Sequence, residues 1–198
     1  IHGNKSQNAR TRALADFKGL KLRASNRWVT KLLAALGATP VGMPVGQVPD
    51  ALSKHVLDGA AMPWEIVPSL KVHELVKFLS ETDPKSRALY TTGFVVAMNP
   101  AKYSSLSDEL KRVIDANSGA EFSAMAGKMW DDTAAPHRKL AAARGNQFLV
   151  ISALELKAWA KVSEPVFDAW INEVNAKGMD GAALLKSAKE QIERYDPN

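Results

Sequence analysis

The first half of the sequence alternates between short apolar segments and segments with helical periodicity. The short segments cover residues 20–23, 39–43 and 60–62, and apolar residues recur at helical spacing in 27–36 and 47–55. This alternation is typical of α/β proteins, because a helix that crosses over the sheet returns the chain to the start of the next parallel strand. The sequence therefore predicts an α/β fold with parallel pairing in this half.

The second half combines long helical patterns with the most strand-like segment of the chain. That segment is 88–98, which is rich in Tyr, Thr, Phe and Val. Residues 107–143 follow as a helical pattern of unusual length, with bends expected at 117–119 and at Pro136. The other expectations are a helix at 64–70, a strand or helix at 73–79, a strand at 147–151, and helices at 153–177 and 181–195.

A basic residue stands at the end of the first predicted strand. In an α/β sheet, ligands bind outside the carboxyl ends of the strands, and Arg23, Val45 and Met62 lie at or just after such ends. A polar turn and a helix N-terminus follow Arg23, so its guanidinium could pair with a carboxylate in a field that favours anions. An Arg paired with a surface Glu would give the same pattern, and the residues alone favour neither interpretation.

Trp64 is the second candidate, because it follows Met62 and Pro63 at the end of the third predicted strand. A Trp in that position can form the apolar wall of a ligand pocket. Packing in the core beneath its own helix is the alternative, and the chemistry of the residue alone favours that alternative.

Composition and motifs support no catalytic site. The chain has 198 residues, no Cys and a net charge of +5, and its basic residues are scattered among acidic ones. This scatter argues against nucleic acid and leaves a small bias toward anionic small ligands. No two of the four His residues lie three or four positions apart, no nucleophile or nucleotide-binding motif occurs, and the apolar runs are too short to cross a bilayer. We therefore predict no catalytic residues, no metal site, no cofactor and no enzyme activity.

Several blocks of sequence resemble the substrate-binding proteins of TRAP (tripartite ATP-independent periplasmic) transporters. They are Asp16–Arg23, Leu36–Pro44, and Val48–Leu52 with its continuation Val56–Gly59, followed by the later segments 70–77 and 106–116. The blocks occur in the order and at the spacing of the family. The resemblance therefore extends over most of the chain, from about Ala15 to Tyr195.

The resemblance implies both a fold and a role. The fold is that of a type II-like periplasmic binding protein, in which two α/β lobes joined by crossing strands and a long helix close over a ligand. The resemblance also implies that Arg23 binds the carboxylate of a small organic acid and that Asn26 contacts the ligand. The protein would be a periplasmic monomer that delivers its ligand to the membrane permease subunits. An α/β enzyme or a sensor domain that acts on a small carboxylic acid is the alternative.

Two departures from the family pattern concern the ligand. Many members carry Gln-Glu-Asn-Pro where this chain has Ala60–Pro63, and sugar-acid binders often have Phe where this chain has Val45. Val45, Met62 and Trp64 together then predict an apolar pocket. The expected ligand is a 2-oxo acid or an aromatic carboxylate rather than a polar sugar acid.

The resemblance also predicts how the chain is divided. Family members have a further N-terminal lobe, which is expected to be absent from this sequence. Residues 1–87 are predicted to form ligand-binding lobe II, and residues 88–128 to be a crossover strand and helix of lobe I. Residues 129–198 are predicted to be the long C-terminal helices that complete lobe II and the hinge.

Overall fold

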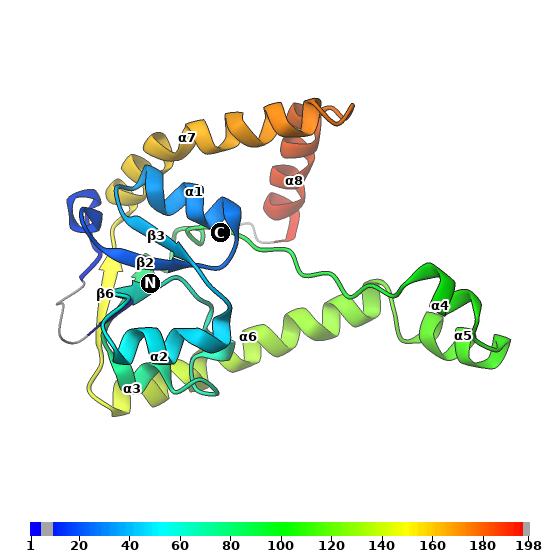
Figure 1. Ribbon diagram of the computed structural model, residues 1–198, viewed down its shortest axis with the longest axis horizontal. Helices are drawn as coiled ribbons and strands as arrows, with labels where there is room; N and C mark the ends of the chain where they lie inside the picture. Colours follow the sequence, from blue (N-terminus) through cyan, green and yellow to red (C-terminus); the bar gives the residue numbers. More distant parts are fainter. Residues whose placement is uncertain (5–9, 196–198) are drawn as a thin grey trace.

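The computed structural model describes residues 1–4 and 10–195, and this part of the chain contains one mixed sheet with helices on both faces (Figure 1). The sheet has six strands in the order β3-β2-β4-β1-β5-β6. Their bounds are His2–Asn4 for β1, Lys21–Ala24 for β2, Thr39–Gly42 for β3, Gly59–Ala60 for β4, Val76–Thr82 for β5 and Gln147–Ile151 for β6.

Strand β1 joins two parallel halves of the sheet. β2 pairs in parallel with β3 and β4, β5 pairs in parallel with β6, and β1 lies antiparallel between β4 and β5. Gly59 approaches β1 so closely that an added Cβ would lie 2.6 Å from the carbonyl oxygen of His2. The predicted α/β fold with parallel pairing is confirmed. Strand β1 could not be predicted from the sequence, because three residues are too few to show a period.

Helices cover both faces of the sheet (Figure 1). α1 (Arg27–Ala35) and α7 (Ala153–Asn175) pack on one face, and α2 (Val48–Ser53), α3 (Val72–Leu75) and α6 (Ala120–Ala143) lie along the other. The remaining helices are α4 (Pro100–Ser104), α5 (Asp108–Ala116) and α8 (Gly181–Tyr195), with single 3-10 turns at Leu14–Phe17, Val45–Gln47 and Trp64–Ile66. Within the described ranges, no helix combines the length and the apolar character needed to cross a membrane.

Alternate residues of β2 face opposite sides of the sheet. Leu22 and Ala24 belong to the core cluster beneath α1 and α7. Arg23 lies between them in sequence, so its side chain projects from the other face. Its neighbours across the sheet, Val41 and Ala60, belong to the core cluster on that second face. The strand period therefore directs a charged side chain toward the mostly apolar layer that contains α2, α3 and α6.

The prediction of a strand at 88–98 is wrong for the described part of the chain. These residues have no strand pairing, and Phe94, Val95 and Val96 are 66%, 86% and 83% exposed. The segment leads away from the sheet toward α4 and α5, which project from the body of the molecule (Figure 1). Strand propensity reflects packing against neighbouring strands, and the described chain brings no strand beside this segment.

Two helical predictions also need correction, and the structure resolves one segment that the sequence left open. The single helix expected over 107–143 is two helices, because the chain breaks between α5 and α6 at Gly119, whose φ is +79°. The helix expected over 64–70 is reduced to the 3-10 turn Trp64–Ile66 and further turns. The segment 73–79, which the sequence left open between strand and helix, contains both, since α3 ends at Leu75 and β5 begins at the next residue.

His2 lies at the centre of the sheet with its imidazole buried. It pairs with Ala60 on one side and with Leu79 on the other, and its Nε2 lies 3.2 Å from the carbonyl oxygen of Met62. Burial lowers the pKa of His2 to about 3. The folded protein therefore holds this imidazole neutral.

We expect the free energy of unfolding to decrease as the pH falls below 6.5, the ordinary pKa of His2, toward the folded value of about 3. In that window the unfolded chain binds a proton that the folded chain excludes, so stability is complete above the window and is lost within it by up to about 1.4 kcal/mol per pH unit. Urea unfolding at several pH values measures this slope. His2→Gln should reduce the slope, and an unchanged slope in the variant would contradict the assignment.

Candidate functional site

The Arg23 side chain is held at the carboxyl edge of three neighbouring parallel strands. Only 6% of the residue is exposed. Its Nε donates to the carbonyl oxygen of Met43 and its Nη1 to that of Ala61, each at 3.3 Å. These carbonyls follow β3 and β4, the two strands that flank β2. The guanidinium is therefore fixed where ligands bind in sheets of this kind.

This buried cation has no acidic partner within residues 1–4 and 10–195. Its hydrogen-bond acceptors there are two neutral carbonyls, and it makes no ion pair with a carboxylate. Burial lowers the pKa of Arg23, and the charge of Tyr90 opposes that shift. A guanidinium has five N–H donors, so Nη2 and the second hydrogen of Nη1 remain for another acceptor. The arrangement is chemically suited to an anion.

The Arg23 guanidinium is within electrostatic reach of Tyr90, a residue that the sequence did not mark as a candidate. Tyr90 is half-buried and packs on the core cluster beneath α1. Burial raises the pKa of Tyr90, while the Ser25 hydrogen bond and the charge of Arg23 act in the opposite direction. Tyr90 belongs to the segment that was predicted as a strand, so no local signal marked it as a site residue.

Glu65 adds a negative group near the same phenol. The charge of Glu65 contributes to the raised pKa of Tyr90, which places the carboxylate within electrostatic reach. Its Oε2 is buried and has no hydrogen-bond partner among the described residues. A carboxylate with one buried oxygen therefore lies within electrostatic reach of Tyr90.

Asn26 is the N-cap of α1. Its Oδ1 accepts hydrogen bonds from the backbone N–H groups of Trp28 at 2.9 Å and Val29 at 3.0 Å, and its side chain is exposed. Two of the free donors at this helix N-terminus are thereby satisfied within the chain. Only the amide nitrogen of Asn26 remains for the ligand contact that the resemblance implies.

Met62 and Trp64 line an open cavity of about 560 Å³, which also borders Leu89 and Arg138. Arg23, Asn26 and Val45 do not line this cavity. Val45 begins the 3-10 turn after β3 and packs on the same core cluster as Met62 and Trp64. The structure therefore brings Met62 and Trp64 together at one cavity, and Arg23 is bonded to the carbonyl of Ala61, the residue before Met62.

The indole of Trp64 is anchored on several sides. Its Nε1 donates to Glu81 Oε1 at 3.1 Å, and its ring stacks on Phe148 with centroids 6.1 Å apart. His2 meets the same ring edge to face at 5.4 Å. Arg138 donates to both oxygens of Glu81, so the indole is connected to α6 through one carboxylate. These contacts fix the orientation of the ring at the cavity wall.

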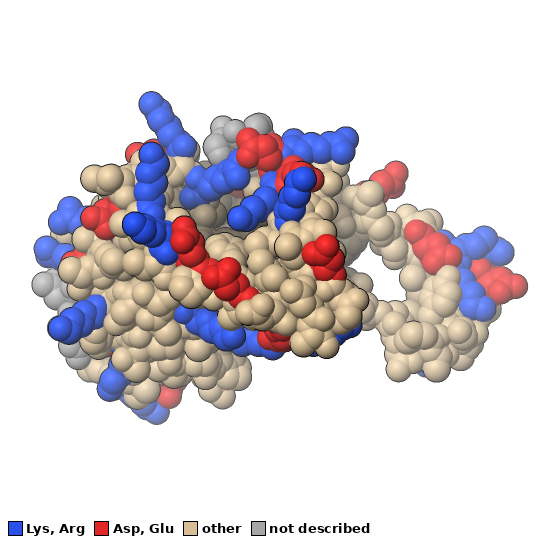
Figure 2. Space-filling view, turned by 90° about the horizontal axis from the view of Figure 1, so that it is seen from above, with Lys and Arg blue, Asp and Glu red and all other residues tan. Residues whose placement is uncertain are grey.

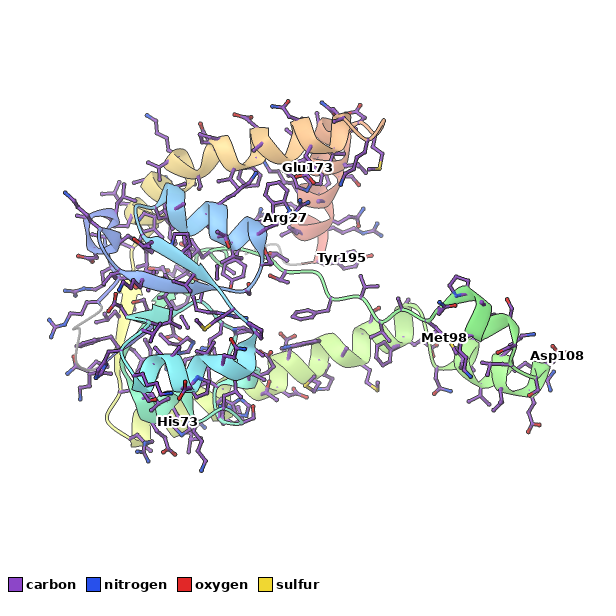
Figure 3. All side chains as sticks on the ribbon, viewed as in Figure 1. Arg27, His73, Met98, Asp108, Glu173 and Tyr195 are labelled. Carbon is purple, nitrogen blue, oxygen red and sulfur yellow. The ribbon has the colours of Figure 1, made fainter. Side chains whose placement is uncertain are left out.

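Charges elsewhere form no single-sign region on the face seen in Figure 2, where Lys and Arg lie interspersed with Asp and Glu. Arg27, four residues after Arg23, differs from Arg23 in that it is paired with a carboxylate. It is exposed and points toward Glu173 of α7, with Nη2 2.6 Å from Oε1 (Figure 3). Among the described residues, no three His, Cys, Asp or Glu side chains are grouped so that they could hold a metal ion.

Comparison with known proteins assigns this chain to a family. The model for DctP, the bacterial extracellular solute-binding protein family 7, matches residues 4–173. The chain therefore belongs to this family of extracellular solute-binding proteins. The resemblance to TRAP solute-binding proteins is confirmed by solved structures of that class.

Two of these structures are close in both fold and sequence. A TRAP solute-binding protein from Rhodoferax ferrireducens in complex with copurified benzoate has a TM-score of 0.91 and 45% identity. A marine metagenome protein in complex with 3-hydroxybenzoate has a TM-score of 0.90 and 46% identity. Each comparison covers 98% of this chain but only 59% and 60% of the respective relative.

A characterised sequence relative is more distant. The 2,3-diketo-L-gulonate-binding periplasmic protein YiaO of Escherichia coli is 34% identical over 101 residues, which cover 50% of this chain and 29% of YiaO. The chain thus spans about three fifths of the length of its solved relatives and less than a third of YiaO.

We expect Asn26→Ala to destabilise the fold by about 1 kcal/mol, because two N–H groups at the start of α1 lose their acceptor. Asn26→Ser should retain most of the stability, since a Ser hydroxyl also caps a helix. Urea unfolding of the two variants measures the difference. Equal stability of Asn26→Ala and the wild-type chain would show that the cap contributes little.

Proposed function

We propose that this chain is part of the periplasmic substrate-binding component of a TRAP transporter and that it captures a small organic carboxylate. The observation that carries the proposal is the buried Arg23 guanidinium, which has unused donors and no carboxylate partner among the described residues. A carboxylate would pair with it through charge-assisted hydrogen bonds, the strongest kind available to this side chain. Asn26 is proposed as a further ligand contact through its amide nitrogen.

An aromatic monocarboxylate is the ligand class that we favour over a 2-oxo acid. Met62 and Trp64 offer an apolar and aromatic wall next to the main chain that binds Arg23, with Val45 packed behind them. The relatives bound to benzoate and 3-hydroxybenzoate are 45% and 46% identical to this chain. Glu65, which has one buried carboxylate oxygen and lies within electrostatic reach of Tyr90, would repel a second carboxylate on the ligand.

Capture is proposed rather than catalysis because the family consists of solute-binding proteins. Tyr90 lies within electrostatic reach of Arg23, but binding of a carboxylate needs no proton transfer from it. The protein is proposed to act in the periplasm as a monomer and to deliver its ligand to the permease subunits of the transporter.

The division into lobes is also proposed. Residues 1–87 and 129–198 would form one lobe with its hinge, which agrees with the pairing of β5 with β6. Residues 88–128 would pack against a lobe formed by the part of the longer relatives that this chain does not cover. Large apolar side chains exposed along this region support that role: Phe94, Val95, Val96, Leu110, Val113, Phe122 and Met125.

We expect Arg23→Ala to weaken benzoate binding by about 30- to 4000-fold, which corresponds to roughly 2–5 kcal/mol for removal of one partner of a buried charge pair. Isothermal titration calorimetry on the full-length protein measures this loss. Arg27→Ala is the matched control, because it removes an exposed guanidinium at the next helix and should leave the affinity unchanged. Binding of benzoate by Arg23→Ala with wild-type affinity would contradict the proposal.

If residues 94–96 pair with further segments, their backbone amides should exchange slowly with solvent in the full-length protein. In the 198-residue chain alone these residues are exposed and unpaired, so exchange should be rapid. Hydrogen exchange followed by mass spectrometry compares the two proteins directly. Rapid exchange in both would argue against the proposed role of this segment.

A further inference from the structure

Glu81, which accepts the indole N–H of Trp64, lies at the same edge and on the same face of the sheet as Arg23. β4 and β5 both run antiparallel to β1, so they are parallel to each other, and their carboxyl ends lie at the edge where β2 ends. Glu81 is near the carboxyl end of β5, two residues after Leu79, so both side chains leave the same face of the strand. Leu79 belongs to the core cluster that also contains Ala60, the neighbour of Arg23 across the sheet.

The Glu81 carboxylate binds two donors that come from different elements. Its Oε1 accepts a hydrogen bond from Nε1 of Trp64 at 3.1 Å, and its Oε2 accepts one from Nε of Arg138 at 3.0 Å. Trp64 begins the 3-10 turn after β4 and Arg138 lies on α6, so one carboxylate on β5 connects three elements. Only 25% of the Glu81 side chain is exposed, compared with 51% of the Arg138 side chain. Hydrogen bonds to a charged group are roughly twice as strong as neutral ones, so Glu81 is a firm acceptor for the indole.

The indole has one polar anchor, and an open cavity lies beside it. Among the residues that the structure describes, Glu81 is the single hydrogen-bond partner of Trp64 Nε1, while Phe148 and His2 contact the ring through their own rings. The cavity of about 560 Å³ borders the same indole. A half-buried indole needs a partner for its N–H. Without Glu81, rotation of the ring into the cavity would let this N–H reach solvent.

We propose that Glu81 is a positioning residue that holds the Trp64 indole against the cavity wall and keeps the cavity open for the ring of an aromatic carboxylate. The inference rests on the proposed function and assigns the positioning of its aromatic wall to one side chain. Arg138 in turn holds the Glu81 carboxylate, and its Cζ lies 4.1 Å from the centroid of the Phe148 ring on which the indole stacks. An indole that fills the cavity competes with the ligand, so the apparent affinity falls in proportion to the fraction of molecules in which the indole is held in place.

The experiment is a set of benzoate titrations on the full-length protein by isothermal titration calorimetry. Glu81→Met removes the acceptor and keeps a side chain of similar length, and we expect an affinity about 10- to 100-fold weaker, the effect of a lost hydrogen bond to a charged group. Glu81→Gln keeps an amide oxygen that accepts the indole N–H, so its affinity should stay within about fivefold of the wild-type value. Glu173→Met is the matched control, because the Glu173 side chain is 30% exposed but pairs with Arg27 outside the cavity, and its loss should leave the affinity unchanged.

A double-mutant cycle separates positioning of the indole from other effects of Glu81. Trp64→Phe keeps an aromatic wall that has no N–H, so Glu81→Met should cause no further loss of benzoate affinity in the Trp64→Phe background. A loss of the same size in both backgrounds would assign the effect to the freed Arg138 guanidinium or to the fold, and it would overturn the inference. The ligand-free melting temperature of Glu81→Gln should stay near that of the wild-type protein, since both donors keep an acceptor.

Failure of the inference is distinguishable from failure of the proposed function. If the wild-type protein binds benzoate and the affinity of Glu81→Met lies within about twofold of it, the role of Glu81 is overturned and the proposed function stands. Glu81→Gln as weak as Glu81→Met would show that the charge matters rather than the acceptor, with the same consequence. Wild-type protein that binds neither benzoate nor 3-hydroxybenzoate would overturn the proposed ligand class, and the role of Glu81 with it.

Discussion

Parallel pairing of β2 with β3 and β4 brings the carboxyl ends of three strands to one edge of the sheet. The carbonyls of Met43 and Ala61 follow two of these strands, and both accept hydrogen bonds from Arg23. Removing a charge from water costs free energy unless polar groups replace its hydration, and two neutral carbonyls replace only part of it. An incoming carboxylate would supply the remainder, so the capacity to bind an anion follows from the pairing of the strands.

Trp64 meets a second constraint, because an indole at the edge of a cavity must satisfy its N–H while its ring remains available. Glu81 accepts the indole N–H, and Arg138 of α6 holds the Glu81 carboxylate. His137, next to Arg138, lies 3.0 Å from the Trp64 carbonyl through Nδ1. The ring is therefore neither a simple core residue nor a free surface residue, since it is half-buried and also borders the cavity.

Elements with complete local signals could be predicted from the sequence. The bounds expected for β6 and α8 are those observed, because a turn or a cap marks each end within a few residues. The absence of a strand at 88–98, a segment exposed from residue 91 onward, could not be predicted, because strand propensity depends on a partner that the described chain does not place beside it. Arg23 was identified as a candidate from its position at a strand end. Tyr90 was not, because only the tertiary fold brings it to Ser25.

Closure of the proposed trap would depend on how differently the ligand binds the open and closed states, because a ligand shifts such an equilibrium only by its differential affinity for the two states. A nearly complete switch needs a factor of about 10,000, or about 5.5 kcal/mol. A buried charge pair contributes about 2–5 kcal/mol. An ion pair with Arg23 that formed only in the closed state would therefore supply much of the driving free energy, and the apolar walls would have to supply the rest.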